Sequence, residues 1–200
     1  MSDEAHFHLH GTVNKQSFLN WSAGNPHELH QCPTCDPKVT VWSRGIIGPY
    51  FFEDEDGKAI TVKSHLYTEI INEFLSPNLP PNSGILWFQQ DGATAHTAVI
   101  SIAALRRLFP QRVISRFGDV PWPPRSPDLS TPDFFLWCYL KSKVYSNRPT
   151  DLHALTENTR EEIAKLSKET LQAVMRIFLT RVHLCIEEDG GHLKDIVHKK

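Results

Sequence analysis

Apolar and polar residues alternate in the first third of the chain, and this pattern predicts β-strands. Within residues 5–10, Ala5, Phe7 and Leu9 are apolar and the residues between them are polar, which is the period of a strand with one buried face. Three further β-rich runs, each bounded by turn sequences, lie at 38–42, 46–52 and 59–62. The first two of these runs are expected to form a hairpin. The opening third is therefore predicted to be an antiparallel meander.

Beyond residue 63, apolar residues recur every three or four positions, and this pattern predicts helices. Leu66, Ile70 and Phe74 keep this spacing, so residues 64–75 are expected to form an amphipathic helix. The remaining predicted elements are short strands at 85–90 and 112–115 and helices at 97–109, 131–144, 150–166 and 168–187. This order predicts an α/β fold, in which a mixed sheet has flanking helices and a C-terminal helical segment, within a single domain over 1–200.

Composition and charge narrow the classes to which the chain can belong. Hydrophobic residues make up 40% and charged residues 22%, which is typical of a globular domain and argues against a disordered or fibrous chain. The chain shows no secretory signal and no apolar run near the ~20 residues that span a bilayer, so an intracellular protein is expected. The net charge of -2 argues against tight DNA binding by this domain alone, because that affinity comes largely from cations that neutralise phosphates.

Three aspartates occupy positions from which a carboxylate can reach a metal ion. Asp91 directly follows the predicted strand 85–90, and open α/β sheets place ligand sites at the carboxyl ends of strands. Asp133 lies in the first turn of a helix that Thr131 is expected to cap, and Asp3 opens the first strand. Magnesium takes one or two carboxylates per ion, so three aspartates suffice for a two-ion site of phosphoryl transfer. An ordinary capping or solvated role for each aspartate is the alternative.

Four segments of the chain resemble the catalytic domain of mariner-type transposases: SDEAHFHLHGTVNKQ at 2–16, IIGPYFFED at 46–54, WFQQDGATAHTA at 87–98 and RVISRFGDVPWPPRSPDLSTPDFFLWCYLKSKVY at 112–145. The resemblance implies a ribonuclease-H-like fold whose acidic metal ligands lie in the SDE, QQDGA and PDFFLW motifs, at Asp3, Asp91 and Asp133. Asp128, the first aspartate of the last motif, is then expected to structure its loop. The resemblance also implies Mg²⁺ or Mn²⁺ as cofactor and DNA, at transposon ends and targets, as partner.

The same resemblance implies DNA strand cleavage and strand transfer in the nucleus, with a homodimer as a further expectation and neither a membrane nor a small-molecule substrate. Members of the family carry helix-turn-helix units ahead of this domain, and only two residues precede Asp3 here. An N-terminally truncated copy is therefore expected, with Asp3 at a frayed strand end. The alternatives are a catalytically inactive remnant, a domesticated nucleic-acid-binding protein, or another nuclease of the same fold.

Further candidate residues lie near these motifs or in the long loop that follows the first strand. His27, His30, Cys32 and Cys35 have side chains that bind zinc, but their cramped spacing makes an ordinary surface loop the alternative. Histidine and basic side chains around the two later motifs are expected to contact nucleic acid: His96, Arg116, Arg125, Lys141 and Lys143. For His96 a packing role at a helix start is the alternative. Packing is also the expected role of Trp122, Trp137 and Cys138.

Overall fold

The antiparallel part of the sheet is built from the N-terminal third of the chain. The computed structural model describes residues 1–9, 34–54, 59–81, 83–123 and 126–190. Strands β1 (Ser2–Glu4), β4 (Pro37–Trp42) and β5 (Gly45–Phe51) form one antiparallel ladder, in which Asp3 lies opposite Val39. β2 (Phe7–His8) pairs with β3 (Thr34–Cys35), also antiparallel. The hairpin predicted from 38–42 and 46–52 is confirmed.

Parallel strands complete the sheet on the other side of β1. They are β6 (Phe88–Gln89), β7 (Val113–Ser115) and β8 (Val120–Pro121). A parallel bridge between Ser2 and Gln90 joins this ladder to β1, so the mixed sheet has the order β5-β4-β1-β6-β7-β8. The predicted α/β fold with a mixed sheet is confirmed. Asp3 and Asp91 each directly follow a residue of this bridge, so two candidate ligands lie on neighbouring strands.

Several strands differ from those predicted. In the described part of the predicted strand 5–10, only β2 forms, whereas β1 ends before that range and belongs to a separate ladder. The predicted strand at 59–62 is wrong, because only Ala59 pairs, in a single bridge with Glu53. β8 lies in a segment expected to be a loop. The turn before it is held by Asp119, whose carboxylate accepts a hydrogen bond from the Val113 backbone N–H (3.0 Å).

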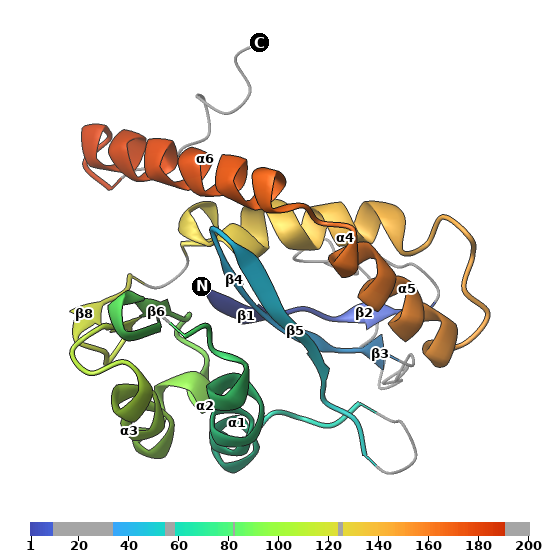
Figure 1. Cartoon of the computed structure of the whole chain (residues 1–200), viewed down its shortest axis with the longest axis horizontal. Coiled ribbons are helices and arrows are strands. Elements are labelled where there is room, and N and C mark those ends of the chain that lie inside the picture. The colour runs from blue at the N-terminus through green and yellow to red at the C-terminus, as the bar shows by residue number, and fades with distance from the viewer. Residues whose placement is uncertain (10–33, 55–58, 82, 124–125, 191–200) are drawn as a thin grey trace, which may run out of the picture.

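Helices cover both faces of the sheet (Figure 1). On one side lie α1 (Ser64–Ile70) with its π-helical continuation (Ile71–Leu75), α2 (Thr94–Thr97) and α3 (Val99–Leu108). On the other side lie a π-helical turn (Pro132–Leu136), α4 (Trp137–Lys143), α5 (Leu152–Ala164) and α6 (Lys168–Glu187). Short 3-10 helices occur at Ser76–Asn78, Ser83–Ile85 and Pro127–Leu129. No helix in the described part of the chain has the length and hydropathy needed to cross a membrane.

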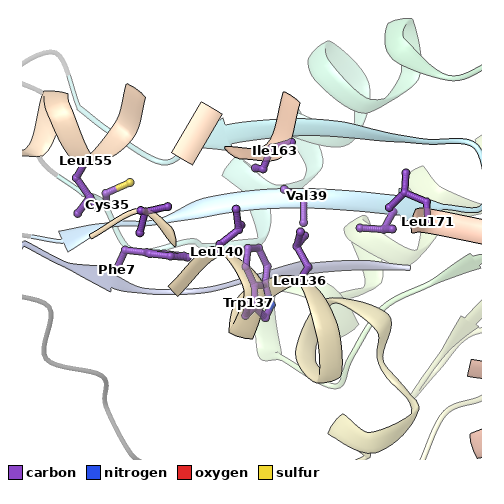
Figure 2. Packing of buried hydrophobic residues seen from close by; sticks show 11 residues of the cluster. Phe7, Cys35, Val39, Leu136, Trp137, Leu140, Leu155, Ile163 and Leu171 are labelled. Atoms are coloured by element: carbon purple, nitrogen blue, oxygen red, sulfur yellow. The ribbon is translucent and has the colours of Figure 1, made fainter. Parts of the chain in front are cut away.

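Two hydrophobic clusters hold these layers together. One lies between β4 and the helices α4 to α6, and it includes Val39, Leu136, Trp137, Leu140 and Leu155 (Figure 2). The other lies between the sheet and the helices α1 and α3, and it includes Ile47, Tyr67, Phe88, Leu105 and Phe109. Because successive side chains of a strand point to opposite faces, neighbouring residues of β1 and β4 contribute to different layers.

Side-chain caps fix the starts of the two long helices. Asp151 before α5 and Ser167 before α6 each accept a hydrogen bond from a backbone N–H three residues further on, at 2.8 and 3.2 Å. The expected cap at Thr131 is wrong, because its backbone is already helical and its buried hydroxyl donates to Met175 Sδ (3.8 Å). The helix predicted at 97–109 begins at Val99, since the extended backbone of Ala98 separates α2 from α3.

Candidate active site

A cleft of about 650 Å³ opens beside the carboxyl end of β6. Asp91 lines it directly after that strand, and Asp133 lines it from the helical turn before α4. The proline-rich loop forms another part of the wall, through Trp122, Pro123, Ser126, Pro127 and Ser130. The Arg181 guanidinium on α6 donates to the Asp128 backbone carbonyl (3.1 Å) and lies 3.6 Å from the Asp128 carboxylate, so it fastens this loop.

Asp3 is held firmly beside the cleft, which its neighbour Ser2 lines. The Asp3 side chain is buried and accepts a hydrogen bond from the Trp137 indole N–H (Nε1 to Oδ2, 2.7 Å). The chain before it is tied to β4, since the Met1 amino group donates to the Val41 carbonyl (2.9 Å) and the Val41 N–H donates to the Met1 carbonyl (2.8 Å). The expectation of a frayed Asp3 is therefore wrong, because pairing with β4 holds its backbone and the indole holds its side chain.

Burial and neighbouring charges raise the pKa values of two carboxylates at this cleft, Asp3 and Asp133. Burial raises the pKa of Asp3 to about 7, and the charges of Asp133 and, more weakly, Asp91 add to the effect against the hydrogen bond from Trp137. Burial also raises the pKa of Asp133, with a further contribution from the charge of Asp91. Asp3 therefore lies within the electrostatic field of Asp133 and Asp91, and Asp133 within that of Asp91, although the three come from distant parts of the sequence.

Asp91 differs from the other two carboxylates because it has a cationic partner. Burial acts to raise its pKa, but the hydrogen bond and charge of the His96 ring, with the Ala93 N–H, outweigh burial and lower it. Both hydrogen bonds end on Oδ1, from His96 Nδ1 at 2.5 Å and from Ala93 N at 3.0 Å. The Asp91 side chain is 53% exposed, and among the described residues no hydrogen bond ends on its Oδ2. Oδ2 can therefore coordinate a cation that enters the cleft.

His96 joins two carboxylates inside the protein. Its ring is buried, Nδ1 contacts Asp91 and Nε2 lies 3.0 Å from Glu4 Oε1, while Glu4 also forms a close ion pair with buried Lys38. Burial acts to lower the pKa of His96, but the charge of Glu4 and the two hydrogen bonds raise it. Burial acts to raise the pKa of Glu4, but Lys38 and His96 bring it to about 2. Because both ring nitrogens are engaged, the structure favours the packing alternative for His96 over a nucleic-acid contact.

The roles of three residues around the site could not be predicted from the sequence. Glu4, beside Asp3, and Lys38, in the predicted strand 38–42, are not among the predicted site residues. Trp137 packs as expected, but it also supplies the hydrogen bond to Asp3. A buried indole N–H needs an acceptor, but the sequence does not show that this acceptor is Asp3, 134 positions away. No comparable signal singled out Lys38, because lysine is rarely fully buried.

Two of the predicted nucleic-acid-binding basic residues lie close to the cleft. Arg116 is exposed and lies beside Gly92, which lines the cleft. A β-carbon built onto Gly92 would lie 3.9 Å from Arg116 Cδ. Lys141 lies close enough to Asp133 for its charge to oppose the rise in the pKa of that carboxyl. Lys143 is exposed in the last turn of α4. The contact of these residues with DNA stays a prediction.

Part of the predicted site set lies outside the described residues: Arg125, His27, His30 and Cys32. The zinc hypothesis therefore stays a prediction. Cys35, on β3, is buried, its Sγ accepts a hydrogen bond from the Thr156 hydroxyl (3.5 Å), and burial raises its pKa to about 12. The packing role expected of Cys138 is wrong, because its side chain is exposed.

The three aspartates fit a divalent cation in chemical type, as oxygen ligands around a cleft. In the described part of the chain, no three His, Cys, Asp or Glu side chains are gathered closely enough to hold one ion together. Magnesium takes one or two protein carboxylates and completes its shell with water and phosphate oxygens, so three carboxylates serving two ions do not have to meet at one point. The charges of neighbouring carboxylates contribute to the raised pKa values of Asp3 and Asp133, and a bound cation would oppose that contribution.

The sheet consists of antiparallel strands followed by parallel ones, with carboxylates on the two central strands. This arrangement defines a ribonuclease-H-like fold. Solved structures of the Mos1 transposase share it. They include the paired-end complex with the left transposon end (TM-score 0.72, 18% identity), the mariner paired-end complex with Mn (0.73, 19%) and the catalytic domain with Raltegravir and Mg (0.70, 18%). At this level of identity, the likeness establishes the fold.

The similarity covers nearly the whole of this chain but only part of the neighbours. All three comparisons cover 96% of this chain, which spans 55% of the length of the transposase in both complexes and 83% of the catalytic-domain chain. No family model matches the sequence, and no curated protein matches it. The structural comparisons therefore establish the fold, and membership of the transposase family is proposed below.

Proposed function

We propose that this chain is the catalytic domain of a mariner-type transposase, which cleaves DNA strands and transfers them to a target with Mg²⁺ or Mn²⁺. The observation that carries the proposal is that Asp91 and Asp133 line one cleft and Asp3 lies beside it, where the charges of Asp133 and Asp91 contribute to its raised pKa. The Mos1 structures include complexes with a transposon end and with Mn or Mg, which supports DNA as substrate and a divalent cation as cofactor.

The residues of the cleft have distinct parts in this proposal. Asp3, Asp91 and Asp133 would hold the cations, which supply charge that stabilises the attacking and leaving oxygens of phosphoryl transfer. Trp137 holds one oxygen of Asp3 in place, and Asp91 presents Oδ2 to the cleft. The positively charged side chains of Arg116 and Lys141 lie beside the cleft, and Lys143 lies further along α4. These side chains would neutralise phosphates of the DNA backbone. Action in the nucleus and as a homodimer follows from the proposal as an expectation.

A plasmid-nicking assay tests the proposal. The wild-type protein is expected to convert supercoiled plasmid to the open circular form with Mn²⁺ or Mg²⁺ and to be inactive in EDTA. Because metal ligation stabilises the transition state by several kcal/mol, Asp91→Asn and Asp133→Asn are each expected to lower the rate at least ~100-fold. Asp128→Asn is the matched control and should leave nicking unchanged, since its carboxylate is half exposed and asparagine keeps the backbone carbonyl that accepts the hydrogen bond from Arg181. Nicking that persists unaltered in Asp91→Asn would overturn the proposal.

A catalytically inactive nucleic-acid-binding protein of the same fold is the second candidate. It is favoured by one observation, the lack of a compact metal-binding cluster in the described residues. Calorimetric titration with Mn²⁺ and fluorescence anisotropy with a labelled DNA duplex separate the two functions. DNA binding without Mn²⁺ binding supports the second candidate. Mn²⁺ binding that is lost in Asp91→Asn supports the first.

A further inference from the structure

A chain of alternating charges runs through the interior behind Asp91. It begins at Lys38 on β4, continues through Glu4 on β1 to the His96 ring on α2, and ends at Asp91 beside the cleft. Lys38 and His96 are 5% and 2% exposed. Burying charged groups costs free energy that their mutual attraction often fails to recover, so a network of this kind is weak evidence for a purely stabilising role.

The backbone around His96 is held as firmly as its ring. The Gln90 side-chain amide donates to the His96 carbonyl (2.8 Å), and Gln90 is itself buried at the bridge to β1. The Tyr67 ring packs against the imidazole, with 4.4 Å between ring centroids. The position of the imidazole is therefore set from several sides, independently of Asp91.

The contact with Asp91 determines which carboxylate oxygen faces the cleft. His96 Nδ1 and the Ala93 N–H both engage Oδ1, so rotation about the Cβ–Cγ bond would break two hydrogen bonds. Glu4 engages Nε2 on the opposite edge of the ring and thereby orients the imidazole toward Asp91. Carboxylates that bind metals are commonly oriented by such outer hydrogen bonds, and removing the partner typically weakens metal binding about 10- to 100-fold.

We propose that His96 is a positioning residue for metal binding, which holds Oδ1 of Asp91 so that Oδ2 is presented to the cation, and that Glu4 sets the orientation of the imidazole. This inference rests on the proposed function, because it takes Asp91 to be a metal ligand. It assigns His96 a place behind the site, without contact to DNA or to the reacting atoms.

Two amide substitutions at His96 separate positioning from packing. An asparagine amide nitrogen lies close to the place of Nδ1, whereas a glutamine amide nitrogen reaches the place of Nε2. His96→Asn can therefore keep the hydrogen bond to Asp91, and His96→Gln keeps the one to Glu4 instead. In calorimetric titration with Mn²⁺, His96→Gln is expected to raise the dissociation constant about 10- to 100-fold. His96→Asn is expected to stay close to the wild type.

Thermal unfolding of each variant shows whether the protein is still folded. Thr159→Ala is the control for loss of a buried polar group remote from the cleft, since the Thr159 hydroxyl donates within α5 to the Leu155 carbonyl (2.8 Å). This control is expected to lower the melting temperature without changing the affinity for Mn²⁺. Equal affinities of His96→Asn and His96→Gln, whether both lowered or both unchanged, would overturn the positioning role.

Proton NMR of the metal-free protein provides a second readout that does not depend on the cation. The buried ring N–H protons of His96 are expected to exchange slowly and to give resolved downfield signals. Asp91→Asn is expected to shift the Nδ1 proton and Glu4→Gln the Nε2 proton. If the wild type bound no Mn²⁺, the proposed function would fail, while these signals would still decide the His96 contacts. The absence of any response to Asp91→Asn would overturn the inference.

Discussion

Replacing Asp3 by asparagine should stabilise the metal-free protein at neutral and alkaline pH. Burial, with the charge of Asp133, raises the pKa of Asp3 from 3.8 to about 7. The folded protein therefore binds a proton at Asp3 more tightly than the unfolded chain does. Stability is lost as the pH rises from about 4 to about 7, and it is not recovered above that range. Asparagine removes the charge but keeps an oxygen that can accept the hydrogen bond from Trp137.

The size of the effect follows from the two pKa values. At about 1.36 kcal/mol for each pH unit, the interval from 3.8 to about 7 corresponds to on the order of 4 kcal/mol. This is an upper limit, because a buried ionised carboxylate admits water and rearranges its neighbours. A gain of roughly 1 to 4 kcal/mol is therefore expected for Asp3→Asn at pH 8. In a chain of this size, about 1 kcal/mol shifts the melting temperature by roughly 2 to 4 °C.

Urea unfolding in EDTA at pH 5 and pH 8 provides the measurement. The free energy of unfolding of Asp3→Asn, compared with the wild type, should show a small gain at pH 5 and a larger one at pH 8. Asp128→Asn serves as the matched control for the replacement of an aspartate by asparagine at a half-exposed position. Added Mn²⁺ should stabilise the wild type by mass action but not Asp3→Asn. A gain that stays constant or shrinks between pH 5 and pH 8 would refute the electrostatic reasoning.

Two further predictions concern residues next to the site and in the core. Trp137→Phe keeps an aromatic ring in the cluster but leaves Asp3 without its indole donor, so urea unfolding at pH 8 should show a loss of roughly 1 to 3 kcal/mol. That loss should be smaller at pH 5, where Asp3 is protonated, and an equal loss at both pH values would indicate lost packing alone. In alkylation with iodoacetamide followed by mass spectrometry, exposed Cys138 should react in the native protein. Buried Cys35, whose pKa burial raises to about 12, should react only after unfolding, and rapid native labelling of Cys35 would contradict its position.

The long helices were predictable from the sequence because their signals are local. α5 and α6 combine sustained apolar periodicity with the capping residues Asp151 and Ser167, and the predicted ends lie within two residues of those observed. The central strands carry weaker signals. The apolar run at 85–90 predicts a strand of six residues, yet β6 contains only Phe88 and Gln89. Ile85 and Trp87 are exposed and lie before the ladder, which begins where its partner β7 begins, and this partner cannot be inferred from the run itself.

The candidate ligands were predictable only through the resemblance of their motifs. Periodicity places Asp91 at a strand end and Asp133 at a helix start, but it does not show that both border one cleft. Their approach to Asp3 depends on the bridge between Ser2 and Gln90, a contact across 88 positions of the sequence. The residues that contact the ligands are harder still to predict, because Lys38 and His96 are buried charged residues paired with half-buried Glu4, and they therefore violate the pattern on which the prediction rests.

The alternation of side chains along β1 explains how one short strand can serve both the ligand set and its support. The Asp3 side chain lies on the face of the sheet that α4 covers, where it contacts Trp137. The Glu4 side chain lies on the opposite face, where it contacts Lys38 and His96. The metal-free protein thus neutralises Asp91 through His96 but leaves Asp3 and Asp133 with raised pKa values. A cation would relieve that remaining repulsion, which is why the substitution that removes the Asp3 charge should favour stability and oppose metal binding at the same time.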